Sequence, residues 1–148
     1  MYKIGIIGGG IWGAALAKLL SNHRVCIYAR DEKTVKSINE NKIHPKLKYT
    51  IFSENVSSTL NLNDLETVEY VFIALPSQEI RQVLTDYTIS NNKQQIIIAS
   101  KGIEVETGFF LSQVVKEVVN TERINVLSGP CFLEEIYRQP AEIFLIIK

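Results

Sequence analysis

Three glycines near the start of the chain have the types and spacing of a phosphate-binding loop. Gly8, Gly10 and Gly13 form a G-x-G-x-x-G pattern, which follows an apolar run and opens an Ala/Leu-rich helical pattern. Gly8 permits a tight turn, Gly10 lets a pyrophosphate approach the main chain, and Gly13 allows helix and strand to pack closely. The free N–H groups at the helix start then attract phosphate. The alternative is a tight strand-to-helix turn that binds nothing.

Two charged residues, Arg30 and Asp31, close the second apolar segment, about 20 residues after the glycines. An acidic residue at this point binds the ribose 2′-OH of NAD, whereas an arginine suits the 2′-phosphate of NADP. Because Arg30 comes first, the sequence favours NADP, or the use of both cofactors. In the alternative interpretation Arg30 is a solvated charge and Asp31 only caps a helix.

Three later segments carry candidate residues directly after apolar strands. Pro76 would lie beside the ribose or the nicotinamide, unless it only ends a strand. Lys101 follows a buried strand, where burial would be costly without a partner such as a phosphate or a reacting carbonyl. Its ammonium would stabilise a growing alkoxide, whereas the alternative is an exposed loop lysine. Residues 128–131 precede a helix that could hold a small phosphate, or they form a plain Gly-Pro turn.

The other candidate side chains have structural interpretations. His23 and His44 are expected at the surface, because neither has a Cys, Asp or Glu neighbour at ligand spacing, and no metal site is predicted. Trp12 would either shield a bound cofactor or pack in the core. Cys26 and Cys131 lack metal-ligand spacing and are expected as reduced thiols of a cytoplasmic protein.

Length and composition favour one globular domain. The chain has 148 residues, of which 46% are hydrophobic and 22% charged, and its formal net charge is zero. Without a basic excess, no nucleic-acid partner is expected. No apolar stretch reaches the roughly 18 residues of a membrane span. A strand follows Met1 to Lys3 almost at once, so no signal peptide is expected.

Strand and helix patterns alternate along the chain and would position these residues. This alternation predicts a Rossmann-type doubly wound, mostly parallel sheet in a single three-layer domain spanning 1–148. The candidate residues then meet at the carboxyl ends of the strands, where such folds bind ligands. Strands are expected at 3–7, 24–29, 56–60, 69–75, 95–99, 124–127 and 143–147, and helices at 11–21, 31–39, 61–65, 77–87, 107–120 and 132–137.

One segment and two helices carry more specific expectations. Residues 41–56 contain Pro45 and could form an irregular arm or an added hairpin. The helix at 11–21 is expected to pack Ala14, Ala15, Ala17 and Leu19 on the sheet. The helix at 107–120 is expected to turn Phe110, Leu111, Val114, Val115 and Val118 inward.

The sequence resembles the NAD(P)-dependent glycerol-3-phosphate dehydrogenases over nearly its whole length. The family interconverts sn-glycerol 3-phosphate and dihydroxyacetone phosphate by hydride transfer. The matching segments are GGGIWGAALA at 8–17, YARD at 28–31, ALPSQEIRQVL at 74–84, ASKGIE at 99–104, TG..LSQV within 107–114 and LSGPCFLEE at 127–135.

The resemblance assigns roles to individual residues. It implies that Lys101 is catalytic and contacts both cofactor and substrate, and that Gly129 and the position of Cys131 contact a small phosphorylated substrate. The residues expected at the cofactor, NADP or NAD, are Gly8, Gly10, Ile11, Trp12, Gly13, Arg30, Asp31, Tyr49, Pro76, Lys101 and Leu133.

The chain departs from the family pattern at several positions. Ile11 stands where the family has a small hydroxyl residue, Cys131 where it has serine, and Leu133 where it has alanine. Tyr49 matches the tyrosine of a tyrosine-leucine-proline segment only loosely. Residues 140–142 read Pro-Ala-Glu where the family has Pro-Thr-Ala.

Length is the largest departure. Family members continue into a C-terminal helical domain that supplies most substrate-binding residues, so this chain resembles the cofactor domain alone. We expect little turnover from it by itself, a C-terminal half acting in trans, and self-association through exposed apolar surface, for instance as a homodimer. The alternatives are a stand-alone dinucleotide-binding module or pseudoenzyme from a split gene, and a hydroxyacyl-CoA or ketopantoate reductase type of dehydrogenase.

Overall fold

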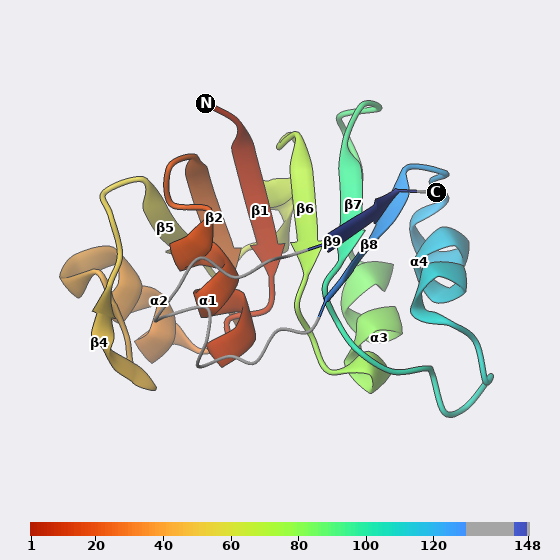
Figure 1. Cartoon of the computed structure of the whole chain (residues 1–148), viewed down its shortest axis with the longest axis horizontal. Coiled ribbons are helices and arrows are strands. Elements are labelled where there is room, and N and C mark those ends of the chain that lie inside the picture. The colour runs from red at the N-terminus through yellow and green to blue at the C-terminus, as the bar shows by residue number, and fades with distance from the viewer. Residues whose placement is uncertain (130–143, 148) are drawn as a thin grey trace.

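The computed structural model describes residues 1–129 and 144–147, and in it a seven-stranded sheet is covered by helices (Figure 1). The strand order is β5-β2-β1-β6-β7-β8-β9. Six strands run parallel, and β9 pairs antiparallel with β8, which confirms the mostly parallel Rossmann-type sheet. The strands are β1 (Lys3–Ile7), β2 (Arg24–Tyr28), β5 (Val56–Thr59), β6 (Tyr70–Ile73), β7 (Gln95–Ile98), β8 (Ile124–Ser128) and β9 (Phe144–Ile147).

Successive strand residues point into two separate cores, one on each face of the sheet. In β1, Ile6 packs with the cluster that contains α1 and α2 residues, whereas Ile7 packs with the cluster of α3 and α4 residues. Strands that are apolar on both faces are typical of a covered parallel sheet. The covering elements are α1 (Ile11–Leu19) and α2 (Glu32–Asn41) on one face, and the 3-10 turn η1 (Leu62–Leu65) with α3 (Ile80–Thr85) and α4 (Leu111–Val119) on the other. A second 3-10 turn, η2 (Ser77–Glu79), leads directly into α3.

Helix α2 begins at the cap that the sequence predicts. The Asp31 carboxylate accepts hydrogen bonds from the Thr34 N–H at 3.0 Å and from the Thr34 hydroxyl at 2.6 Å. The hydroxyl bond in particular lowers the pKa of Asp31. The helix ends at Asn41, and the next residue, Lys42, takes a left-handed conformation with φ 55°.

A hairpin follows α2, which confirms one of the two interpretations of residues 41–56. It pairs β3 (Ile43–His44) with β4 (Leu47–Ile51) in antiparallel fashion at the outer edge of the domain (Figure 1). The prediction that His44 lies at the surface is wrong, because only 1% of this residue is exposed. The hairpin turns His44 inward, where its ring reaches the main chain of the glycine loop.

Three helices differ from the predicted ones. Helix α4 begins at Leu111, because Gly108 with φ +71° turns the chain before it, and Phe110 is 68% exposed rather than facing inward. In α1 it is Leu16 that is buried, whereas Leu19 is 39% exposed. The predicted helix at 77–87 is a 3-10 turn followed by the short α3. The predicted helix at 132–137 lies outside the described residues.

Candidate functional site

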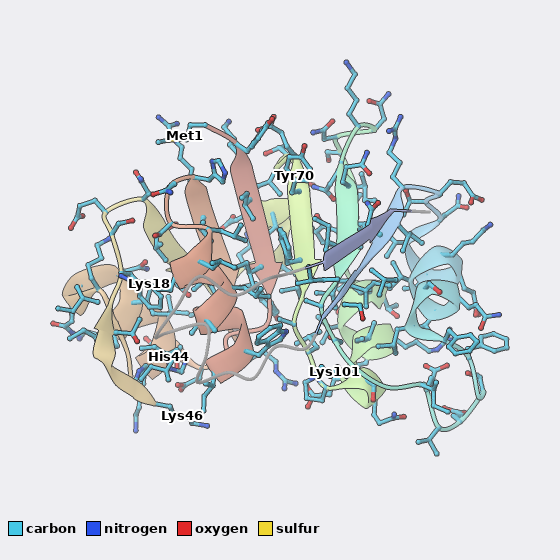
Figure 2. All side chains as sticks on the ribbon, viewed as in Figure 1. Met1, Lys18, His44, Lys46, Tyr70 and Lys101 are labelled. Atoms are coloured by element: carbon cyan, nitrogen blue, oxygen red, sulfur yellow. The ribbon has the colours of Figure 1, made fainter. Side chains whose placement is uncertain are left out.

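The carboxyl ends of the parallel strands meet at one edge of the sheet, where open α/β folds bind ligands. The glycine loop follows β1, Arg30 follows β2, Pro76 follows β6, and Lys101 follows β7. Figure 2 shows Lys101 at this lower edge, opposite the edge that carries Met1 and Tyr70. Most of the residues that the sequence proposed are therefore brought together.

Two adjoining hollows form a groove along this edge, which we call the strand-end groove. The smaller has a volume of about 320 Å³ and reaches from Gly8 to Arg30 and Glu79. The larger has a volume of about 970 Å³ and reaches from Trp12 to Lys101 and Gly129. Both hollows are lined by the same four residues at their junction, namely Gly10, Ala74, Leu75 and Pro76.

The three glycines of the loop have different surroundings. A Cβ on Gly8, whose φ is +131°, would lie 2.3 Å from the Ala74 carbonyl oxygen, and one on Gly13 would lie 1.9 Å from the Gly8 carbonyl oxygen. Among the residues that the structure describes, a Cβ on Gly10 would meet no atom within 4 Å. Gly8 and Gly13 are thus required by the packing of strand, loop and helix, whereas Gly10 leaves open space at the junction of the two hollows.

This open space lies at the N-terminus of α1. Gly10 is the N-cap and has no side chain to accept a hydrogen bond from the first turn, and the first turn holds no acidic residue. The first N–H groups of a helix have no partner within the helix, and together with the helix dipole they attract anions. The cradle fits the diphosphate of a dinucleotide.

Trp12 packs against the core, as one of its two interpretations predicts, and it also borders the larger hollow. Its indole N–H donates a hydrogen bond of 2.8 Å to the Ala99 carbonyl oxygen, which fixes the ring against the end of β7. The half-buried ring packs against the core and also lines the larger hollow. Its neighbour Ile11 is 37% exposed and lines the same hollow.

Of the two interpretations of Lys101 that the sequence left open, the structure shows an exposed loop lysine. The chain turns outward at Gly102, which has φ +113° and leaves the ammonium at the wall of the larger hollow. Beside it, the Ser100 hydroxyl accepts the Leu75 N–H at 3.0 Å and donates to the Ile73 carbonyl at 3.1 Å. Ser100 thereby joins the ends of β6 and β7.

Side chains of η2 and α3 hold the loop that carries Lys101, and the sequence analysis missed them. The Gln78 amide donates to the Ile103 carbonyl at 2.8 Å and accepts the Val105 N–H at 2.9 Å. Arg81 donates two hydrogen bonds, of 2.8 and 2.9 Å, to the two carboxylate oxygens of Glu104. No local pattern marks these contacts, because they join segments more than 20 residues apart.

The Arg81–Glu104 pair makes the stability of this loop depend on pH. The Arg81 hydrogen bonds hold the pKa of Glu104 at about 2, well below its usual value of 4.5. A carboxylate whose pKa is lowered by folding stabilises the folded state fully above its unfolded pKa, and this contribution is lost as the pH falls toward the folded value. We expect Glu104→Gln to be less stable than the wild type at pH 7, with a difference that shrinks from pH 4.5 toward pH 2. Urea unfolding across this range measures it.

Glu106 offers the matched control, because it is an exposed glutamate in the same loop. Glu106→Gln should unfold at the wild-type urea concentration at pH 7. An equal loss of stability in both variants would contradict the role of the Arg81–Glu104 pair.

At the other end of the groove, Arg30 donates a hydrogen bond to Glu79 across the smaller hollow. The Arg30 side chain is 63% exposed and that of Glu79 is 35% exposed, so the pair is open to solvent. Asp31 uses its carboxylate to cap α2. Asp31 therefore caps a helix, as the alternative interpretation predicts, while the exposed Arg30 lines the hollow, and its contact with a ribose phosphate stays a prediction.

Several proposed residues cannot be placed in the groove. Cys131 and Leu133 lie outside the described residues, and Tyr49 lies in β4 with a side chain that the structure does not describe. Cys26 is a half-buried free thiol whose pKa is raised by burial.

Two further properties concern only residues 1–129 and 144–147. No three His, Cys, Asp or Glu side chains within these ranges are grouped so as to hold a metal ion. None of the helices formed by these residues has the length and apolar character needed to cross a membrane.

Comparison with known protein families finds a match over residues 3–147, to the family model described as NAD-dependent glycerol-3-phosphate dehydrogenase N-terminus. A glycerol-3-phosphate dehydrogenase (NAD(P)+) of Zymomonas mobilis is 35% identical over 99% of this chain. The one of Neorickettsia sennetsu is 40% identical over 88% of this chain. The chain spans 44% and 40% of the length of these two curated relatives.

Solved structures agree with the sequence relatives. The glycerol-3-phosphate dehydrogenase of Coxiella burnetii matches with a TM-score of 0.87 and 25% identity, over 97% of this chain and 46% of that one. The glycerol-3-phosphate dehydrogenase of Saccharomyces cerevisiae shares the fold, with a TM-score of 0.87 and 20% identity, over 99% of this chain and 47% of that one.

Proposed function

This chain belongs to the family of NAD-dependent glycerol-3-phosphate dehydrogenases, and from this we propose that it binds NAD or NADP in the strand-end groove. The observation that carries the proposal is the open space at Gly10, where the two hollows meet above the N-terminus of α1. The diphosphate binds there, the adenosine half lies in the smaller hollow, and the nicotinamide half lies in the larger one. The N–H groups at Ile11, Trp12 and Gly13 face the diphosphate.

We further propose that the larger hollow is where dihydroxyacetone phosphate and sn-glycerol 3-phosphate are interconverted. A bound nicotinamide ring supplies or accepts the hydride. Lys101 is the catalytic residue at this site, because its exposed ammonium at the hollow's wall stabilises the negative charge that grows on the reduced carbonyl oxygen. Gly129, at the end of β8, contacts the substrate together with Cys131.

The reaction needs more than this groove. The chain covers less than half the length of its relatives, and residues from the remaining part complete the substrate site, in one chain or supplied in trans. Near Lys101, three apolar side chains are exposed, namely Ile103, Val105 and Phe110. We propose that the chain associates through this apolar surface, either with the remaining part of the enzyme or with a second copy of itself. We place this activity in the cytoplasm, where reduced cysteines are the rule.

The test is reduction of dihydroxyacetone phosphate, measured by NADPH or NADH oxidation, together with calorimetric titration of both cofactors. We expect the isolated chain to bind a cofactor and to turn over little, and we expect turnover when a C-terminal half of a relative is added. Cofactor binding without any rescue would favour a stand-alone dinucleotide-binding module. No binding of either dinucleotide would contradict the proposal.

We propose that Arg30 raises the affinity for NADPH by contacting its 2′-phosphate, and that Glu79 lowers this affinity. A 2′-phosphate at Arg30 must compete with the Glu79 carboxylate for the same guanidinium, and the two anions repel each other. We expect Arg30→Ala to weaken NADPH binding by about tenfold or more, the effect of a lost charge-assisted hydrogen bond, and NADH binding by much less. Glu79→Gln should strengthen NADPH binding several-fold. Calorimetric titration of both cofactors measures these changes. If NADPH binds Arg30→Ala as it binds the wild type, Arg30 does not contact the ribose phosphate.

A further inference from the structure

We propose that His44 is a positioning residue for dinucleotide binding, because its buried ring holds the Gly9 carbonyl and thereby aims the Gly10 N–H at the diphosphate. This inference rests on the proposed function of the strand-end groove. His44 itself does not line either of the two hollows, so it acts through the glycine loop.

Both ring nitrogens of His44 are used by the main chain. The Lys46 N–H donates to Nδ1 at 3.2 Å, which makes Nδ1 the acceptor and places the ring proton on Nε2. Nε2 lies 2.9 Å from the Gly9 carbonyl oxygen and donates to it. With 1% of the residue exposed, water does not compete for either bond.

The orientation of one peptide group follows from this contact. In a trans peptide the C=O and the following N–H point in opposite directions, and the described residues contain no cis peptide. Because the Gly9 carbonyl points to the hairpin, the Gly10 N–H points away from it, on the side where Gly10 lines both hollows. His44 therefore selects the peptide orientation that a diphosphate needs.

A glycine-rich loop has little else to fix this peptide. Glycine adopts more backbone conformations than any other residue, and Gly8, Gly9 and Gly10 follow one another. The Gly8 N–H is held by the Tyr28 carbonyl at 3.1 Å, at the end of β2. Gly9 packs so closely on Ala29 that a Cβ added at Gly9 would lie 2.3 Å from the Ala29 Cβ. The His44 bond supplies the remaining constraint.

The hairpin is anchored firmly enough to serve as a support. The Ser37 hydroxyl of α2 donates to the Ile43 carbonyl at 2.7 Å, and the Phe52 N–H donates to the Lys42 carbonyl at 2.7 Å. The Lys18 ammonium of α1 donates to the Ile51 carbonyl at 2.6 Å. Figure 2 shows Lys18 and His44 on this side of the domain, next to the hairpin.

Two substitutions of His44 distinguish its hydrogen bond to Gly9 from its hydrogen bond to Lys46. In His44→Gln the side-chain amide N–H₂ takes the place of Nε2 and can still donate to Gly9. In His44→Asn the shorter side chain can accept the Lys46 N–H but does not reach Gly9. Phe52→Leu is the control. Phe52 is a buried residue that follows the same hairpin, and its backbone N–H donates to the Lys42 carbonyl rather than to Gly9.

Each variant is examined by two measurements. The first is NADH and NADPH affinity by calorimetry. The second is the hydrogen exchange and chemical shift of the Gly10 amide in the ligand-free chain, by NMR, which needs no cofactor. A long-range ¹H–¹⁵N spectrum of the wild type reports which ring nitrogen of His44 carries the proton.

We expect His44→Asn to lose about tenfold in affinity for both dinucleotides and to shift the Gly10 amide. His44→Gln should stay within about threefold of the wild type, and Phe52→Leu should lower stability without lowering affinity. Equal affinities of the Asn and Gln variants, an unchanged Gly10 amide in both, or a ring proton on Nδ1 would overturn the inference. If the wild type binds no dinucleotide, the proposed function fails, whereas the Gly10 amide still decides whether His44 orients the loop.

Discussion

Gly10→Val is expected to keep the fold and to weaken dinucleotide binding by about 100-fold or more, which corresponds to about 2.7 kcal/mol. Gly10 has φ −80° and ψ −178°, an extended conformation that valine adopts readily, and an added Cβ would meet no atom of residues 1–129 or 144–147 within 4 Å. The valine methyl groups would instead fill the space at the N-terminus of α1, where the diphosphate must approach the main chain.

The measurement is a calorimetric titration of NADH and NADPH, with urea unfolding as the test of the fold. Stability should change by about 1 kcal/mol or less, because the substitution only replaces one N-cap residue by a poorer one. Gly10→Ala is the graded control and should bind with intermediate affinity. Wild-type affinity in the folded valine variant would mean that the diphosphate does not lie at Gly10.

Gly13→Ala, unlike Gly10→Val, is expected to destabilise the fold, with a loss of about 3 kcal/mol of stability or more. The added Cβ would lie 1.9 Å from the Gly8 carbonyl oxygen, and that oxygen belongs to the main chain, which cannot rotate away as a side chain can. Either α1 must move off β1 or the loop must open. A domain of this size is stable by only about 5–15 kcal/mol, so the loss is a large part of the total.

Urea unfolding at pH 7 measures this loss, with Gly10→Ala as the control for an added methyl group in the same loop. The Gly13 variant should also bind dinucleotides poorly, since the loop that forms the cradle is displaced. A stability within about 0.5 kcal/mol of the wild type would contradict the close contact of Gly13 with Gly8.

The features that the sequence predicted correctly are the ones that neighbouring residues determine. Gly8 and Gly13 are recognisable because a strand-to-helix turn of this kind imposes a fixed spacing. Asp31 is recognisable as a cap because its hydrogen-bond partner, Thr34, is three residues away. The parallel direction of most strands and the gathering of their ends follow from the alternation of strands and helices and from the rule of right-handed crossovers.

The features that were missed depend on contacts between distant segments. His44 was expected at the surface because nothing near it in sequence marks the Gly9 carbonyl, 35 residues away, as its partner. Phe110 continues the apolar period of α4, but Gly108 turns the chain before the helix begins. For Lys101 the sequence left both a partnered and an exposed lysine open, because a buried strand precedes it; the structure shows it exposed, directly before the turn at Gly102.

Trp12 gives this molecule a built-in optical reporter. It is the only tryptophan in the chain, and its indole is fixed by the Ala99 carbonyl at the wall of the larger hollow. Tryptophan emission overlaps the absorption band of reduced nicotinamide, so occupancy of the groove can be read as quenching and energy transfer without any label. Since no second indole contributes background, the intrinsic emission reports on this one location.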